Sequence, residues 1–214
     1  METAYPSRIF VTGIGTDVGK SYATGWLARR IADSGRRTIT QKFIQTGNTD
    51  MSEDILVHRR IMGIPLQAAD RIHLTCPIIL SYPASPHLAA RIDDTVIDPD
   101  VAARATEALL SEYSTVLIEG AGGIMVPITE SMLTIDYIES HGLPTVVVTN
   151  GQLGSISNTL LTLEAIARRD IPLWGVIYNP HFDSDKVIAD DAREYMHAYV
   201  RRHFPSAHWL TMDE

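Results

Sequence analysis

The sequence has little cysteine, no long apolar run and no excess of basic residues. Its one cysteine, Cys76, cannot form an intramolecular disulfide and excludes a metal site made of clustered cysteines. No apolar stretch approaches the roughly 18–20 residues that a membrane-spanning helix needs. The 18 Lys and Arg residues are outnumbered by 26 Asp and Glu residues, which gives a formal net charge of −8. These features argue against a protein whose main task is to hold nucleic acid or an anionic membrane surface.

The remaining composition is that of an ordinary globular protein. The 214 residues suit one domain, and the shares of hydrophobic residues, 45%, and of charged residues, 21%, lie near globular averages. The amino-terminal segment METAYPSRIFVTG passes directly into a predicted strand and contains no apolar stretch of the signal-peptide type. We therefore expect residues 1–214 to form a single domain that acts in the cytoplasm, a reducing compartment.

Short apolar segments alternate with longer segments of helical period along the chain. The predicted strands are Arg8–Val11, Thr38–Phe43, Thr115–Ile118, Thr145–Thr149 and Leu173–Tyr178. The predicted helices are Lys20–Ser34, Ser52–Met62, Asp98–Tyr113, Ser155–Arg168 and Ser184–Phe204. This alternation predicts an α/β fold of three layers, in which a mostly parallel central sheet carries helices on both faces.

The stretch Ile64–Asp94 departs from this alternation. It contains four prolines, and no single periodicity persists across it. A long irregular segment inside a compact domain is usually either functional or disordered. Its apolar residues, among them Ile78, Ile79 and Leu80, favour an ordered segment.

A glycine-rich loop joins the first predicted strand to the first predicted helix. The segment GIGTDVGKS covers residues 13–21, with Lys20 and Ser21 at its end. Backbone amides of such a loop and the amino end of the following helix attract phosphate, and the lysine adds a full positive charge. A hydroxyl directly after the lysine is the usual Mg²⁺ contact of such loops. The fold is therefore expected to be P-loop NTPase-like, although an ordinary glycine-rich turn with a surface lysine is the alternative.

Acidic residues and a lysine follow at other predicted element ends. Glu119 ends the strand TVLI and Asp54 opens a helix, so with Ser21 they could form an oxygen-only Mg²⁺ site at the carboxyl edge of the sheet. A solvated strand-end carboxylate for Glu119, and interaction with the helix dipole for Asp54, are the alternatives. Lys42, at the same edge, could stabilise charge on a transferring phosphoryl group or simply face solvent.

Together these segments resemble the dethiobiotin synthetase family, the ATP-dependent cyclo-ligases of biotin biosynthesis. The resemblance rests on GIGTDVGKS, on KFIQTG followed by Asp54, on SPH at residues 85–87, on VLIEGAGG, on QLGSISN and on Asn179, and it runs from about Ile9 to Tyr195. The sequence departs from the family pattern at Phe43, where proline is common, and at Ser157, where a polar amide is common. It also lacks a Gly-x-Ile-Pro stretch near its carboxyl end.

The resemblance implies a reaction in which one amine of 7,8-diaminopelargonate captures CO₂ as a carbamate. ATP then phosphorylates the carbamate, and the second amine closes the ureido ring and expels phosphate. In this family Lys20 and Lys42 match the catalytic lysines. The positions that match Mg²⁺ ligands are Ser21, Asp54 and Glu119. The positions that match nucleotide-binding residues are Asp17, Val18, Gly19, Lys20, Ser21, Tyr22, Asp54, Glu119, Gly120, Ala121, Gly122, Asn179 and Pro180.

The resemblance also implies where the substrate lies and that the protein is a homodimer. Thr16, Thr46 and Lys42 match the residues around the reacting end of the substrate. Gly154 and Ser157, with Tyr195, match the pocket that receives the substrate carboxylate across a dimer interface. The amino end of a helix is a suitable carboxylate receptor. Alternatively, Gly154 and Ser157 only begin a helix, and Tyr195 is a core or interface aromatic.

One alternative comes from a different functional class, the switch ATPases of the ParA and MinD type, which act through protein partners or membranes. The predicted carboxyl-terminal helix carries Asp185, Asp190, Asp191 and Glu194 among its basic residues, which is unsuited to an anionic membrane. A glutamine-dependent amidoligase would need a nucleophilic cysteine, and Cys76 stands before a proline in the irregular stretch. The sequence therefore favours the cyclo-ligase.

Overall fold

A computed structural model describes residues 5–212 of the chain. The first residues of the amino-terminal segment, 1–4, and the last two residues, 213–214, lie outside the described part. The strands are β1 (Arg8–Gly13), β2 (Thr38–Lys42), β3 (Gln45–Thr46), β4 (Ile79–Leu80), β5 (Thr115–Gly123), β6 (Thr145–Asn150), β7 (Leu173–Asn179) and β8 (His208–Thr211). The helices are α1 (Lys20–Asp33), α2 (Glu53–Met62), α3 (Ala68–Arg71), α4 (Pro86–Ile92), α5 (Pro99–Leu110), α6 (Thr134–Ser140), α7 (Ser155–Arg168), α8 (Lys186–His203) and the 3₁₀ turn η1 (Pro180–Phe182).

Six strands form the central sheet in the order β2-β5-β1-β6-β7-β8. Every pairing in this sheet is parallel. The predicted α/β fold with a mostly parallel sheet is therefore confirmed. Since parallel strands end at the same edge, the loops after β1, β2, β5 and β7 meet at one side of the sheet, where ligands of open α/β sheets bind.

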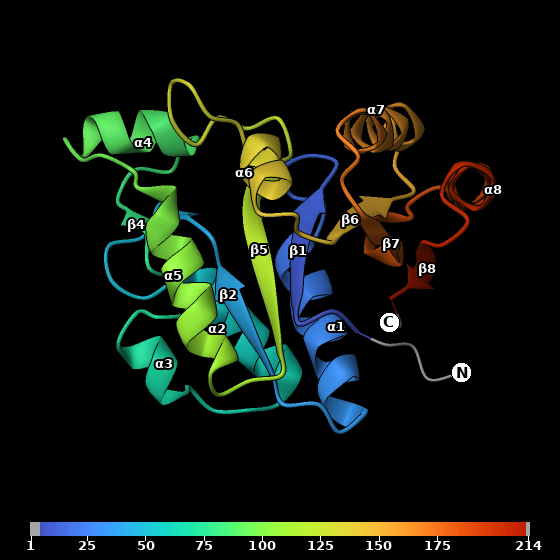
Figure 1. Ribbon diagram of the computed structural model, residues 1–214. Helices are drawn as coiled ribbons and strands as arrows, with labels where there is room; N and C mark the ends of the chain where they lie inside the picture. The colour runs from blue at the N-terminus through green and yellow to red at the C-terminus, as the bar shows by residue number, and fades with distance from the viewer. Residues whose placement is uncertain (1–4, 213–214) are drawn as a thin grey trace.

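The two faces of the sheet are buried against different helices (Figure 1). Alternate residues of β1, such as Ile9 and Val11, pack with Leu27 and Ile31 of α1 on one face. On the other face Phe10 packs in a cluster with buried side chains from α5, α6 and α7. Successive side chains of a strand point to opposite faces, so both faces must be covered, and the strands other than β2 (TITQK) are largely apolar. The sheet with its two helical layers forms the three expected layers.

The stretch 64–94 is ordered, as expected, but it is more regular than the sequence predicts. It contains α3, β4 and α4, and β4 pairs in parallel with β3 to make a separate two-stranded sheet. Other elements that were not predicted are β3, α6, the turn η1 and the edge strand β8, which pairs with β7. Within residues 5–212, none of the helices combines the length and apolar character needed to cross a membrane.

Candidate active site

The glycine-rich loop is a tight turn that leads into α1. Gly19 precedes the helix at φ 86°, a left-handed conformation that favours glycine, and Asp17 also has a positive φ of 57°. Lys20 folds back over the loop, so that its Nζ donates to the carbonyl of Gly15 at 2.8 Å. The helix has no side-chain cap at its amino end, so the amides of its first turn are left for another acceptor. This is the geometry that an anion-binding loop needs.

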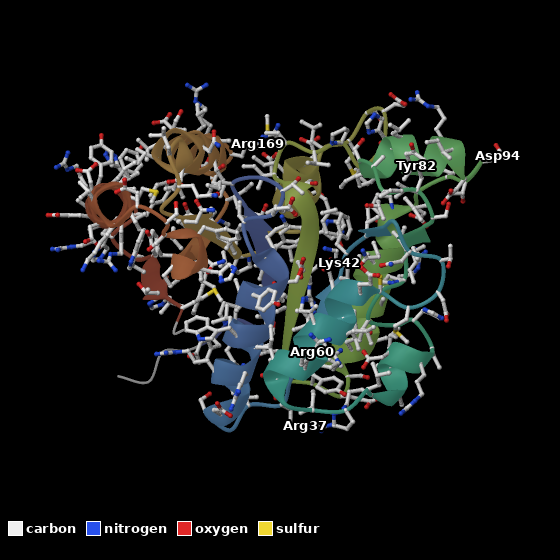
Figure 2. The ribbon with its side chains drawn as sticks, turned by 180° about the vertical axis from the view of Figure 1, so that it is seen from behind. Arg37, Lys42, Arg60, Tyr82, Asp94 and Arg169 are labelled. Atoms are coloured by element: carbon white, nitrogen blue, oxygen red, sulfur yellow. The ribbon has the colours of Figure 1, made fainter. Side chains whose placement is uncertain are left out.

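Lys42 and Glu119 face each other where β2 and β5 end. The two residues are register partners in the parallel pairing of these strands, which places their side chains on the same face, toward α1 and α2. Lys42 Nζ donates to Glu119 Oε1 at 2.8 Å and also pairs with Asp54, from the first turn of α2. Figure 2 shows Lys42 well inside the outline of the molecule, next to β5.

Ser21 lies between the two carboxylates. Its Oγ is 2.7 Å from Asp54 Oδ1 and 3.0 Å from Glu119 Oε1, and as a donor it has one proton to share between them. Two carboxylate oxygens and one hydroxyl oxygen thus converge on one point beside the phosphate loop. Hard oxygen donors of this kind suit Mg²⁺, which keeps several waters and takes phosphate oxygens for its other positions. The donor set fits the ion. Among the described residues, no group of three or more His, Cys, Asp or Glu side chains is placed to hold a metal.

Opposed charges keep this buried cluster ionised. Lys42 is only 5% exposed, and burial alone would lower the pKa of its ammonium, but Glu119 and Asp54 outweigh burial and raise that pKa above its usual value. Burial would likewise raise the pKa of Glu119, which is 1% exposed, yet Lys42 and His58 hold it far below its usual value. At neutral pH the site therefore contains a fixed ammonium next to a fixed carboxylate.

Lys20 differs from Lys42 in its balance of charges. Burial lowers the pKa of Lys20, and the neighbouring ammonium of Lys42 lowers it further, while Glu119, Asp54 and Asp17 act in the opposite direction. The net pKa is below the usual lysine value. Among residues 5–212 Lys20 makes no salt bridge with a carboxylate; its Nζ bonds to the carbonyl of Gly15 instead, which leaves the side chain at the cavity available to a ligand.

These side chains line a cavity of about 990 Å³ at the carboxyl edge of the sheet. A pocket of this size is at the upper end of the range for small-molecule and cofactor sites. The predicted site residues that line it are Thr16, Asp17, Gly19, Lys20, Ser21, Tyr22, Lys42, Thr46, Asp54, Glu119, Ala121, Gly122, Asn179 and Pro180. Two others lie just behind the wall: Gly120, whose carbonyl accepts from Lys42 Nζ at 3.2 Å, and the buried Val18.

The end of the cavity beyond α1 is built by the segment after β7. Asn179 Nδ2 donates to the carbonyl of Val18 at 3.2 Å, and its Oδ1 accepts from the amide of His181 at 3.1 Å. These bonds join the phosphate loop to the 3₁₀ turn η1. A Cβ at Gly19 would stand 2.2 Å from Asn179 Nδ2, so this junction has no room for a side chain.

Three predicted substrate-binding residues do not line this cavity. Gly154 precedes α7 in a left-handed conformation with φ 95°, and Ser157 follows in the first turn of that helix. Both are exposed, and Tyr195 of α8 is 53% exposed. A smaller hollow of about 380 Å³ lies nearby, formed by residues 151–153, 184, 185 and 188. The single chain therefore brings the phosphate loop, both lysines and the acidic residues together, while these three residues remain outside.

Several residues of the site were not found from the sequence. Ile44, Gln45 and Val57 complete the wall near Lys42, and Phe182 and Met212 lie at the other end. Ile44 and Gln45 belong to the segment KFIQTG but were not predicted as site residues, and no spacing or motif marks the other three. The largest omission is His58, whose Nε2 lies 2.5 Å from Glu119 Oε2 although the sequence places it in an ordinary amphipathic helix.

Comparisons with known proteins agree with this geometry. A family model described as an AAA domain matches residues 7–206. The ATP-dependent dethiobiotin synthetase BioD 2 of Haemophilus ducreyi is 44% identical over 205 residues, which is 96% of this chain and 97% of that protein. The ATP-dependent dethiobiotin synthetase BioD of Chlorobaculum tepidum is 47% identical over 193 residues, 90% of this chain and 81% of that protein.

Solved structures resemble the chain in fold at low identity. The crystal structure of FlhF complexed with GMPPNP and Mg²⁺ has a TM-score of 0.56 at 13% identity, and covers 100% of this chain and 68% of FlhF. The structure of pNOB8 ParA bound to nonspecific DNA has a TM-score of 0.54 at 14% identity, and covers 96% of this chain and 80% of ParA. At such identities the likeness shows the fold alone.

Proposed function

This chain belongs to the family of ATP-dependent dethiobiotin synthetases, and on that basis we propose the reaction, the Mg²⁺ site and the roles of the site residues that follow. The chain is an ATP-dependent ligase of biotin biosynthesis acting on small molecules. Its substrates are 7,8-diaminopelargonate, CO₂ and ATP, and its products are dethiobiotin, ADP and phosphate. The switch-ATPase alternative is not favoured, because the similarity to ParA is confined to the fold, whereas the synthetases match at 41–47% identity over at least nine-tenths of the chain.

ATP binds with its phosphates over the glycine-rich loop. The free amides at the start of α1 and the charge of Lys20 bind the β- and γ-phosphates. The purine lies toward Asn179 and Pro180, at the far end of the cavity. Support comes from the one continuous cavity that runs from Lys42 past the loop to the segment after β7.

Mg²⁺ is held by Ser21, Asp54 and Glu119, whose oxygens converge beside the loop. When bound, the ion neutralises charge on the phosphate oxygens and orients the γ-phosphate for transfer. Thr16 and Thr46 lie on the cavity wall and contact the substrate.

The observation that best supports the proposed reaction is the position of Lys42. A buried ammonium, kept charged by Glu119 and Asp54, stands at the edge of the sheet within electrostatic reach of Lys20. One amine of the substrate attacks CO₂; a C–N bond forms as one C–O π bond opens to a carbamate oxygen, and the amine proton passes to solvent. A carbamate oxygen then attacks the γ-phosphorus as the bond to the ADP oxygen breaks, and the second amine attacks the resulting mixed anhydride and expels phosphate. Lys42 and Lys20 together offset the negative charge that two approaching anions bring.

The far end of the substrate lies in a second copy of the chain. Gly154 and Ser157, at the uncapped amino end of α7, receive its carboxylate with Tyr195, and their position outside the main cavity supports a site completed by a homodimer. Because the reaction consumes ATP, CO₂ and a metabolite, we place it in the cytoplasm.

The proposed function is tested by measuring phosphate release from MgATP and bicarbonate with and without 7,8-diaminopelargonate. Release that depends on the diamine, together with a ring-closed urea identified by mass spectrometry, is the expected result. Hydrolysis independent of the diamine would instead support the switch-ATPase alternative, and no hydrolysis would remove the proposed chemistry altogether.

A further inference from the structure

Glu119 has a partner that the reaction does not use. His58 projects from α2 toward the sheet and is 0% exposed. Its Nε2 lies 2.5 Å from Glu119 Oε2, and its Nδ1 lies 2.9 Å from Thr40 Oγ1 on β2. The other oxygen of the carboxylate, Oε1, faces Lys42 and Ser21. The two oxygens of Glu119 thus have separate surroundings, one inside the sheet–helix interface and one at the cavity.

Glu119 determines which nitrogen of His58 carries the proton, because its ionised carboxylate can only accept, and Nε2 is the nitrogen in contact with it. Arg59 Nη1 lies 2.7 Å from Thr40 Oγ1, and a guanidinium can only donate, so Thr40 accepts there. The hydroxyl proton of Thr40 is thus left for His58 Nδ1, which lies 2.9 Å away. In the neutral ring Nδ1 is therefore the acceptor, and Nε2 carries the proton that is donated to Glu119.

Arg59 is itself fixed from the opposite side. Its Nε and Nη2 donate to the two carboxylate oxygens of Asp70 at 2.9 and 2.7 Å, a bidentate pair that is almost wholly buried. Thr75 also donates to Asp70, at 2.6 Å. The resulting chain of bonds runs from α3 through Arg59, Thr40 and His58 to Glu119, and each member has its orientation set by the one before it.

We propose that His58 is a positioning residue for the divalent cation, which holds Glu119 Oε2 away from the cavity so that Oε1 alone faces Ser21 and the ion. This inference rests on the proposed Mg²⁺ site. Without the donor at Oε2, that buried oxygen lacks a partner, and the carboxylate gains by turning so that both oxygens contact Lys42. The ion then has to compete with the ammonium for its ligand. Partners that orient a metal ligand commonly contribute about 10–100-fold in metal affinity.

The test is the dissociation constant of Mn²⁺ for the full chain in the presence of ADP, measured by electron paramagnetic resonance of the free ion. His58→Leu removes the donor and is expected to weaken binding by about 10–100-fold. His58→Gln, whose amide nitrogen can stand in for Nε2, is expected to recover most of that affinity. Leu109→Ala, a cavity in α5 away from the site, controls for general destabilisation and is expected to leave the constant unchanged.

A second pair of variants tests the same chain of bonds without altering the histidine. Thr40→Val removes the hydroxyl that holds the other ring nitrogen, and a smaller loss of Mn²⁺ affinity is expected, whereas Thr40→Ser restores the hydroxyl and the affinity. This pair also decides the question if His58→Leu does not fold. Wild-type affinity in His58→Leu, or in Thr40→Val where the leucine variant cannot be purified, overturns the inference. Failure of the wild-type chain to bind Mn²⁺ with ADP overturns the proposed cation site instead.

Discussion

Replacing Lys42 by methionine should destabilise the free protein and also abolish ligation. Methionine keeps much of the volume of the side chain but removes its ammonium. Asp54 and Glu119 would then remain on either side of Ser21 as two carboxylates whose main counter-charge is missing. Lys20 is near but makes no salt bridge with either carboxylate among the described residues.

The magnitude follows from burial. Removing one partner of a buried ion pair typically costs about 3–5 kcal/mol, because the other charge is left unpaired in a poorly solvated place. Lys42 and Glu119 are both almost fully buried, so this range applies to their pair. A domain of this size loses roughly 2–4 °C of melting temperature per kcal/mol, which predicts a drop of roughly 6–20 °C.

The assay is urea unfolding at neutral pH in EDTA, repeated with excess Mg²⁺. The ion should recover part of the lost free energy of unfolding in the variant, because it supplies positive charge to the same carboxylates. Lys186→Met, at the exposed first residue of α8, is the matched control and should change little. A Lys42→Met protein as stable as the wild type in EDTA would refute the claim that the buried carboxylates depend on this ammonium as their counter-charge.

Three further predictions concern the loop and the buried carboxylates. Lys20→Ala should abolish turnover with little loss of stability, since Lys20 makes no salt bridge within residues 5–212; near-normal turnover would contradict its phosphate role. Gly19→Ala should weaken ATP binding measured by calorimetry. Gly35→Ala, at a similar φ of 89° but with no atoms near the new Cβ, should leave ATP binding unchanged and lower the free energy of unfolding only by the backbone strain of about 1–2 kcal/mol. The free energy of unfolding should fall as pH drops below about 4.5, because Glu119 and Asp70 have folded pKa values below the usual 4.5 and 3.8 and the unfolded chain takes up their protons first. Asp70→Asn should flatten that acid slope in urea titrations, and an unchanged slope would contradict it.

The parts of the fold that were predictable are those with strong local patterns. The apolar strands and the amphipathic helices were located within a few residues; Ser52, the first residue of one predicted helix, caps α2 by accepting from the amide of Ile55. Strand β5 runs on to Gly123, five residues past the predicted end, because the glycine segment continues the pairing with β1. The edge strand β8 was missed because His208–Thr211 is short and only half-buried.

The site residues that belong to a motif were predictable. Those that are buried because they pair with residues distant in the sequence were not. Lys20, Ser21 and Glu119 stand at strand and helix ends, which the sequence displays. His58 and Arg59 belong to the segment HRR, whose polarity suggests a solvated helix face. Both are buried because Glu119 and Asp70 lie opposite them, at distances in sequence of 61 and 11 residues. No local property of α2 contains that information.

The polar character of β2 has a consequence for how the chain chooses one folded state. The strand lies at the edge of the central sheet and is fully buried, yet Ile39 is its only aliphatic residue. A slip of one position against β5 would turn every side chain to the opposite face. Thr40 would leave the arginine and histidine of α2, and Gln41 would leave Ala102 and Thr106 of α5, to which it bonds at 3.2 and 2.6 Å.

Hydrophobic burial distinguishes poorly between those alignments, because a strand with one aliphatic side chain loses little of it by slipping. A slipped alignment would bury polar groups without partners, and this cost in free energy makes it less stable than the native alignment. Lys42 is the last of these polar groups, and it reaches Glu119 in one alignment only. The polar residues of this strand thus disfavour misaligned states. The Lys42–Glu119 contact of the reacting centre is one of the interactions that select the native strand register.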